Sequence, residues 1–199
     1  ELVVPERYAD AEPFHGGVAW VRRPQVRAWE LIDARGAVVI DESAGYLAVG
    51  PFSDELAWVS REISGGWFAI DRENRVIVAG GYDEVRPFHR GLAPVRRGDW
   101  GAVDAYGRFV VPPRSSGFAT ALISGRVLEG FTEEGHAVVE VGGRVGVVDA
   151  TGRVVVPPVH GAVLIHPGAF VIGDSEGRWG ALDRQGKPMV EVVHFGASE

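Results

Sequence analysis

Trp-Gly-Ala-Val-Asp-Ala-Tyr-Gly-Arg-Phe-Val-Val-Pro-Pro, at residues 100–113, has the pattern of two strands joined by a tight turn. Aromatic and β-branched residues, which favour strands, stand on both sides of the turn. Asp104 and Gly107 fit a type I turn that ends in a left-handed residue and joins antiparallel strands with a bulge. Pro112 and Pro113 end the second strand, because proline has no N–H to donate. The segment therefore predicts a β-hairpin.

The same pattern recurs along the chain. In each copy an aromatic or apolar residue is followed four positions later by Asp, and three positions after that by Gly or Asn. The copies are Trp29, Asp33 and Gly36; Trp67, Asp71 and Asn74; Trp100, Asp104 and Gly107; Val145, Asp149 and Gly152; and Trp179, Asp183 and Gly186. Asp accepts backbone N–H groups inside a turn, while Gly and Asn tolerate a positive φ. We assign these Asp, Gly and Asn residues to structural turns, and we expect glycine to be neutral at position 74.

A further strand precedes each hairpin. It follows a Phe, a polar turn and an Ala, as at Phe88 and Ala93, so one unit is a meander of three antiparallel strands. We expect units near residues 14–50, 51–87, 88–130, 131–165 and 166–199, with residues 1–13 as the end of an upstream unit and an additional strand within residues 118–123. A single unit cannot bury its own apolar side chains. The sequence thus predicts an all-β array of such units, stacked as a solenoid or in a propeller-like arrangement.

Composition excludes several classes of protein. The 199 residues carry a net charge of −7 and contain no cysteine, which rules out disulfides and thiolate metal sites. The absence of a basic block argues against nucleic acid as a partner. No apolar stretch is long enough to predict membrane insertion. We expect a cytoplasmic protein, with export and removal of a signal before Glu1 as the alternative.

The residues from Phe88 to Pro113 resemble the WG-repeat family of bacterial proteins. Trp-Gly itself is present at Trp100-Gly101 and Trp179-Gly180, whereas Trp29-Glu30, Trp67-Phe68 and Val145-Gly146 stand in its place elsewhere. The resemblance implies a tandem β-repeat fold with mostly no assigned chemistry. It also implies a possible role beside bacterial toxins, because some relatives look like immunity or accessory proteins.

Side chains capable of chemistry do not form a recognisable site in the sequence. The histidines lack the paired spacing of metal ligands; they are His15, His89, His136, His160, His166 and His194. The repeated aspartates are explained by turns, and no nucleophile elbow or phosphate-binding glycine loop is present. We therefore predict that the chain is not an enzyme and holds no metal or cofactor.

Two sets of side chains recur at equivalent positions after the Ala of each unit. Arg23, Arg61 and Arg97 form one set, and Trp20 and Trp58 form the other. The tryptophans and arginines should lie on opposite faces of their strands, because side chains alternate with a period of two. In one interpretation the tryptophans are core and the arginines guard a solvated edge. In the other, these residues form a partner-binding surface.

Three classes of function compete. The first is a non-catalytic protein-binding module whose acidic surface covers another protein, such as a basic toxin domain. The second is a carbohydrate- or cell-envelope-binding module that uses exposed tryptophans. The third is an enzyme, which would need a clustered site that the sequence does not contain. We rank them in that order, since function depends on sites and not on the fold.

Overall fold

The computed structural model describes residues 7–118, 121–123, 126–128 and 130–193. Regular structure in these residues consists of β-strands and a 3-10 turn, η1 (Glu42–Ala44). The prediction of an all-β repeat fold is confirmed. Residues 1–6 of the expected upstream remnant lie outside the described residues, as does His194.

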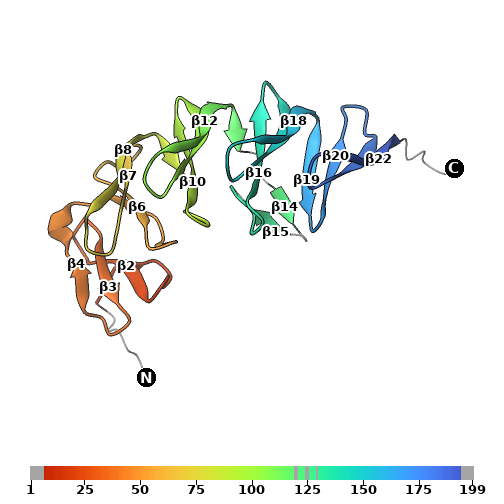
Figure 1. Cartoon of the computed structure of the whole chain (residues 1–199). Helices are drawn as coiled ribbons and strands as arrows, with labels where there is room; N and C mark the ends of the chain where they lie inside the picture. Colours follow the sequence, from red (N-terminus) through yellow and green to blue (C-terminus); the bar gives the residue numbers. More distant parts are fainter. Residues whose placement is uncertain (1–6, 119–120, 124–125, 129, 194–199) are drawn as a thin grey trace. The chain divides into compact units, whose positions relative to one another are not determined.

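Twenty of the strands form five antiparallel sheets of four strands each, in chain order (Figure 1). The first sheet contains β1 (Asp10–Ala11), β2 (Val18–Arg22), β3 (Glu30–Asp33) and β4 (Val38–Ile40), and the second contains β5 (Ala48–Val49), β6 (Ala57–Ser60), β7 (Trp67–Ile70) and β8 (Val76–Tyr82). The third contains β9 (Glu84–Val85), β10 (Leu92–Arg97), β11 (Asp99–Asp104) and β12 (Phe109–Ser115). The fourth contains β13 (Gly117–Phe118), β16 (His136–Val141), β17 (Arg144–Asp149) and β18 (Val154–His160), and the fifth β19 (Ala162–His166), β20 (Ala169–Gly173), β21 (Trp179–Asp183) and β22 (Pro188–Val193).

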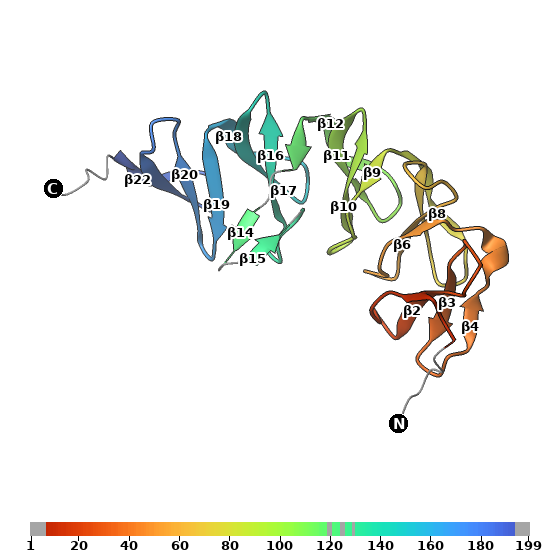
Figure 2. The same ribbon diagram turned by 180° about the vertical axis from the view of Figure 1, so that it is seen from behind.

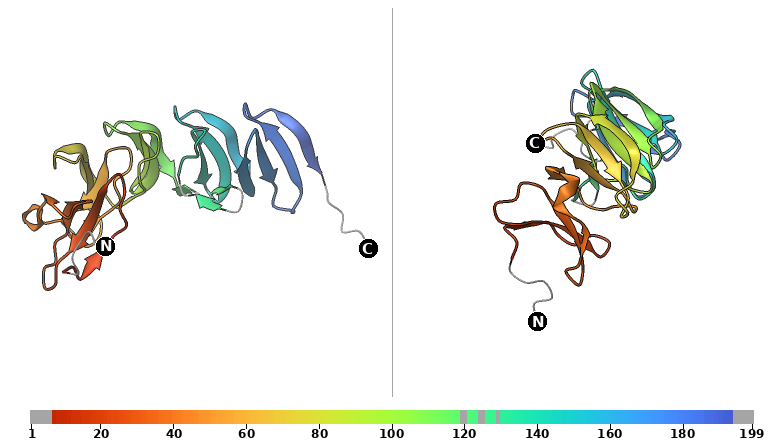
Figure 3. Two further views of the ribbon diagram at one scale, coloured as in Figure 1. Left: turned by 90° about the horizontal axis from the view of Figure 1, so that it is seen from below. Right: turned by 90° about the vertical axis from the view of Figure 1, so that its left-hand side faces the viewer.

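Each sheet has one strand more than the sequence predicted. Figures 2 and 3 show the longer strands of each sheet side by side. The extra strand is the first of each sheet, and it pairs with the strand that follows the repeat's Phe. In the first four sheets this strand has only two residues. Two residues are too few to show the alternation by which a strand is recognised in a sequence.

In the sequence, a separate two-stranded hairpin lies between β13 and β16, which are neighbours in the fourth sheet. Its strands are β14 (Ala121–Ile123) and β15 (Arg126–Leu128), and β14 lies beside β19 (Figures 1 and 2). The predicted additional strand at residues 118–123 is therefore divided. Phe118 belongs to β13, and β14 begins at Ala121.

The described chain divides into two compact units. The first contains residues up to Arg97 together with Val103–Arg108, and the second contains Gly98–Ala102 together with residues from Phe109 onward. Aromatic side chains dominate the core of the first unit, including Trp20, Tyr46 and Phe52 in one cluster and Trp58, Tyr82 and Phe88 in another. The second unit is built mainly on aliphatic residues around Phe170, with Val147, Val156, Ile165 and Ile172 among them.

In the third, fourth and fifth sheets, the turn between the last two strands docks on the last strand of the preceding sheet. A Cβ atom added to Gly107 would lie 3.0 Å from Val78 Cγ1. At Gly152 the approach is closer, since an added Cβ would overlap the carbonyl oxygen of Val110. The turn glycine therefore serves two purposes: it adopts a φ of about +80° and it leaves room for the neighbouring backbone.

Asn74 takes the place of glycine in the second hairpin and has a φ of +63°. Its side-chain oxygen accepts a hydrogen bond of 2.5 Å from the hydroxyl of Tyr46. Tyr46 is buried, so this bond satisfies a hydroxyl that has little access to water. The expectation that glycine is neutral at position 74 is therefore revised, because glycine would remove the acceptor.

Candidate functional site

Trp58 is a core residue that joins two consecutive sheets. Its side chain is buried, and it stacks on Phe88 of the next repeat with ring centroids 5.0 Å apart. Its indole N–H donates a hydrogen bond of 2.9 Å to the carbonyl of Arg86, and the edge of its ring meets Tyr82. Ring packing and a satisfied N–H are what a buried tryptophan needs. The contacts show that each repeat completes its core with residues of the following one.

Trp20 occupies the equivalent position in the first repeat. It is only 2% exposed, stacks on Phe52 and donates its indole N–H to the carbonyl of Gly50 at 2.9 Å. The proposed exposed surface of Trp20 and Trp58 is thus corrected. Both rings lie between sheets, so neither can serve as an open stacking platform.

Arg23 lies at the end of β2 and neutralises a buried acid. Its guanidinium donates two hydrogen bonds to Glu30, at 2.9 and 2.7 Å, and Glu42 lies 3.6 Å away. Glu30 is 1% exposed, whereas the side chain of Arg23 is 44% exposed. A buried carboxylate requires such a partner, because an unpaired buried charge is strongly destabilising.

Arg61 and Arg97 are held over tyrosine rings. The Arg61 guanidinium lies 5.4 Å from the centroid of Tyr46, and that of Arg97 lies 4.6 Å from the centroid of Tyr82. Arg97 also donates to the carbonyl of Gly80 at 2.7 Å. Cation–π contacts and a backbone acceptor fix these exposed side chains in place. The three predicted arginines are therefore ordered at equivalent positions of the first unit.

The repeated aspartates act inside their turns. Asp104 Oδ1 accepts the N–H groups of Tyr106 and Arg108, both at 2.9 Å, and its Oδ2 accepts from the Arg108 side chain at 2.7 Å. Partial burial raises the pKa of Asp104, but these hydrogen bonds outweigh it and the net pKa is lowered. Asp33, Asp71, Asp149 and Asp183 accept the same pair of backbone N–H groups.

A further turn of this kind joins β20 to β21 and was missed from the sequence. Asp174 accepts the N–H groups of Glu176 and Arg178 at 2.9 and 3.0 Å, and Arg178 Nε lies 2.5 Å from its Oδ2. The signal was present, since Asp174 is followed three residues later by Gly177. Phe170, Asp174 and Gly177 also have the spacing of the repeat, but this turn stands between β20 and β21, one strand earlier than the turns of the other copies.

Histidine and acidic side chains do not assemble into a metal site in the part of the chain that the structure describes. His136 packs edge-to-face against Phe170, with the two ring centroids 5.2 Å apart. Burial lowers the pKa of His136, and the positive charge of Arg184 lowers it further. His136 is therefore neutral at physiological pH.

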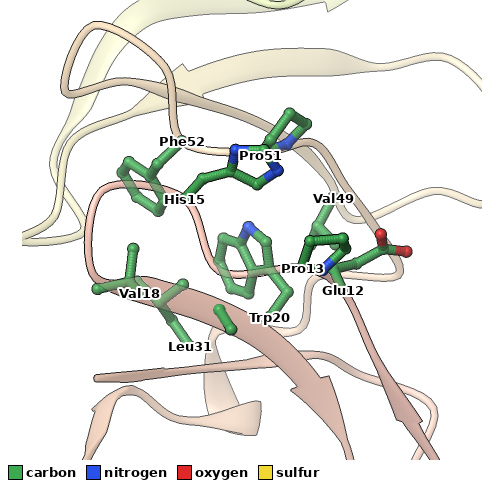
Figure 4. A pocket seen from close by; sticks show the side chains of 10 residues that line it. Glu12, Pro13, His15, Val18, Trp20, Leu31, Val49, Pro51 and Phe52 are labelled. Carbon is green, nitrogen blue, oxygen red and sulfur yellow. The ribbon is translucent and has the colours of Figure 1, made fainter. Parts of the chain in front are cut away.

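A pocket of about 230 Å³ opens between the first two sheets (Figure 4). Its lining is mostly apolar and includes Val18, Trp20, Leu31, Val49, Pro51 and Phe52. The lining also includes two polar side chains, His15 and Glu12. In Figure 4 the Trp20 indole lies in the middle of the lining, while the Glu12 carboxylate points away from it at the edge.

The pocket exists because the first junction between repeats is less tightly tied than the second. At the second junction, the Ser53 hydroxyl donates to the Phe88 carbonyl at 2.5 Å, and Asp54 accepts the N–H of Gly91 at 2.6 Å. The equivalent residues at the first junction are His15 and Gly16. Glycine cannot supply the carboxylate. Correspondingly, the stacked ring centroids are 6.1 Å apart at the first junction and 5.0 Å apart at the second.

A family model described as the WG containing repeat matches residues 1–23 and 67–99. The match covers these two segments of the chain. The match confirms the resemblance inferred from the sequence between Phe88 and Pro113.

The glycine of the Trp-Gly pair has a steric cause. A Cβ on Gly101 would lie 2.6 Å from the carbonyl oxygen of Val111 and 3.0 Å from the nitrogen of Pro113. Gly146, the equivalent residue of the fourth sheet, is crowded in the same way by Val156 and Pro158. The prediction that the two prolines end the last strand is wrong, because β12 and β18 each continue through both of them. This strand crosses directly over the glycine, so any side chain there would collide with backbone.

Solved structures similar to this chain have low sequence identity. The designed protein Ika8 is 13% identical, with 89% of this chain and 59% of that chain covered and a TM-score of 0.46. BamB from Moraxella catarrhalis is 20% identical, with 87% and 56% covered and a TM-score of 0.47. Virginiamycin B lyase from Staphylococcus aureus is 11% identical, with 89% and 67% covered and a TM-score of 0.41. The chain spans less than two thirds of the first two proteins.

No curated protein matches the chain. Among the residues that the structure describes, none of the helical structure is long and apolar enough to cross a membrane.

Proposed function

We propose that the chain is a non-catalytic module that binds another protein through an arginine row, defined as Arg23, Arg61 and Arg97. The row lies at the ends of β2, β6 and β10 in the first unit, one arginine in each sheet. Arginine is enriched at the centres of protein interfaces. The net charge of −7 favours a partner with a basic surface, such as a toxin domain, and the row supplies hydrogen-bond donors within that acidic background.

The ordering of the arginines is the observation that carries the proposal. A flexible arginine loses about 0.5–1.5 kcal/mol of side-chain entropy when a partner immobilises it. Arg61 and Arg97 are already fixed by Tyr46, Tyr82 and backbone carbonyls, so this cost is reduced. A rigid repeat scaffold that presents fixed donors at equal intervals is suited to covering one partner surface.

Carbohydrate binding is no longer supported by a specific observation. That alternative required Trp20 or Trp58 to present an open face, and both rings are buried between sheets. Other tryptophans, such as Trp29 and Trp67, are partly buried and pack against the core clusters. The protein-binding proposal therefore stands alone.

The test is quantitative co-purification from the native host, followed by cross-linking of the bound partner. The double variant Arg61→Ala/Arg97→Ala should lower recovery of a stoichiometric partner by at least about tenfold, given the loss typical of central interface residues. Arg23 is kept, because its removal would leave the buried Glu30 unpaired.

The matched control is Arg75→Ala/Arg108→Ala, which removes two arginines of the same unit whose side chains are 69% and 75% exposed. The proposal requires that this control retain the partner. Equal loss in both double variants would show a nonspecific effect of charge. Full retention in the Arg61 and Arg97 variant would exclude the arginine row as the interface.

A further inference from the structure

The pocket between the first two sheets has the size of a site for one aromatic group. Its volume is about 230 Å³. An apolar cavity of roughly 150 Å³ is known to bind benzene, so this pocket can hold a phenyl ring with a short chain attached. It is smaller than the usual site for a drug-sized ligand, which starts at about 300 Å³.

The lining favours an apolar occupant in the interior. Trp20 and Phe52 supply aromatic surface, and Val18, Leu31 and Val49 supply aliphatic surface. The indole N–H of Trp20 is already bonded to the carbonyl of Gly50, so the ring offers its apolar body and not its donor. Because most of these side chains are already buried, a ligand that fills the space gains mainly from removing its own apolar surface from water, at about 25 cal/mol for each Å².

The edge of the pocket is negatively charged. The Glu12 carboxylate is exposed there, and no side chain in the described part of the chain forms an ion pair with it. The other titratable group in the lining is His15. Because the Glu12 carboxylate points outward from the pocket (Figure 4), a positive charge that stays outside the apolar space, beside the bound group, would meet Glu12 as its partner.

The second junction is packed more closely than the first. There Ser53 and Asp54 tie the loops together, and the Trp58 and Phe88 rings are in closer contact. His15 and Gly16 occupy the positions of Ser53 and Asp54 at the first junction. This junction therefore lacks the hydroxyl and the carboxylate that form these two hydrogen bonds. The first junction therefore combines looser packing of its two rings with a carboxylate at its edge, and both features favour the binding of a ligand.

We propose that this pocket receives an aromatic or aliphatic side chain of a partner protein, with an adjacent lysine or arginine of that partner bound by Glu12. This inference rests on the proposed function, because it identifies the anchor of the protein partner. It adds a second contact to the arginine row. The chemistry of the anchor agrees with a basic partner for an acidic chain.

The pocket can be tested without the partner by titrating small probes. The probes are phenethylamine, its neutral isostere phenethyl alcohol, and the dipeptide N-acetyl-lysyl-phenylalanine amide. The readout is the NMR signal of the Trp20 indole N–H, assigned by its disappearance in Trp20→Phe. Phenethylamine should bind about two- to fivefold more tightly than the alcohol, the range expected for an exposed ion pair. The dipeptide should bind at least as tightly as the amine.

Two variants separate the apolar and the charged contributions. Glu12→Gln should lower the affinity for phenethylamine to that for the alcohol, while the control Glu62→Gln, an exposed carboxylate elsewhere in the same unit, should change neither. Val49→Phe should fill the pocket and abolish binding of all three probes. The surface change at Glu12 leaves the core intact, so the test holds even if Val49→Phe fails to fold.

The outcomes distinguish this inference from the proposed function. The pocket assignment would be overturned if neither phenethylamine nor phenethyl alcohol bound, or if phenethylamine bound equally well to wild type and Glu12→Gln. Neither result would bear on the arginine row. Binding of phenethylamine but not of the dipeptide would overturn a protein side chain as the occupant. Loss of the partner in the Arg61 and Arg97 variant concerns only the proposed function.

Discussion

Replacement of Gly152 by alanine should be far more destabilising than the same change at Gly168. Both glycines have a φ of +82°, so the conformational cost of a Cβ in the left-handed region is the same, about 1–2 kcal/mol. Around Gly168 there is nothing within 4 Å of an added Cβ. At Gly152 the added Cβ would overlap the carbonyl oxygen of Val110 in the preceding sheet. The difference between the two variants therefore measures the docking of one repeat on the next.

The expected magnitude follows from the cost of forcing atoms into occupied space, which is about 1–3 kcal/mol in well-packed proteins. Gly168→Ala should lower the free energy of unfolding by about 1–2 kcal/mol, and Gly152→Ala by about 2–5 kcal/mol. Gly186→Ala should behave like Gly152→Ala, because its added Cβ would overlap the carbonyl of Val155.

The assay is urea denaturation followed by circular dichroism and tryptophan fluorescence. Both glycines lie in the second compact unit, so the variants are compared on the same transition. If the two probes do not coincide, the unfolding is not two-state and the midpoints of that transition are compared instead. Loss of stability in Gly152→Ala that is no greater than in Gly168→Ala would refute the close approach of the turn to the preceding sheet.

Three further predictions concern the first unit and the turns. Trp58→Phe removes the indole donor to the carbonyl of Arg86 and part of the ring contact, so thermal denaturation should show a loss of about 1–3 kcal/mol; an unchanged melting temperature would contradict the bridging role. Asn74→Gly should be destabilising by about 1 kcal/mol, because the unpaired Tyr46 hydroxyl outweighs the relief of positive φ, and Asn74→Gly in a Tyr46→Phe background should be neutral or stabilising. The pKa values of four turn aspartates are lowered in the folded state, so the stability they contribute is present above their unfolded pKa of about 3.9 and is lost as the pH falls through the folded values. Denaturation at a series of pH values should therefore show stability declining below about pH 4, and a flat profile from there to pH 2 would exclude this linkage.

The hairpins could be predicted from the sequence because their determinants are local. Asp104, Gly107 and the flanking valines lie within one turn and two strands, and the hydrogen bonds of the turn join residues at most four positions apart. A repeated local pattern is reinforced with each copy. The sequence therefore contained the repeat, its turns and its strand-rich character.

Alternation placed the tryptophans and the arginines on opposite faces, and the burial of Trp20 and Trp58 agrees with the interpretation that the tryptophans are core. That the opposite face of the strand is also covered could not be predicted. A strand covered on one face buries every second residue, so Trp20 and its neighbours were expected to lie on different faces of which one is exposed. In the structure Ala19, Trp20 and Val21 are all buried, because side chains from both faces of this strand are covered. The partners of Trp20, Gly50 and Phe52, lie about 30 residues away and depend on tertiary contacts.

The pocket was also beyond sequence analysis. It depends on the absence of two tie contacts that only a comparison of the junctions reveals. Once the equivalence of His15 with Ser53 and of Gly16 with Asp54 is known, the sequence signal is plain. The signal was overlooked because both positions are polar turn residues, which are ordinarily interpreted as surface loops.

The bridging position of Trp58 determines where this chain can be cut or recombined. A fragment that stops at the end of β8 would strand Trp58 without Phe88 and without the carbonyl of Arg86. An exchangeable segment should therefore extend beyond its own sheet through the Phe of the next repeat. When repeats of this kind are grafted or duplicated, the junction should be placed after that Phe. The Phe then covers the hydrophobic surface of the sheet that precedes it.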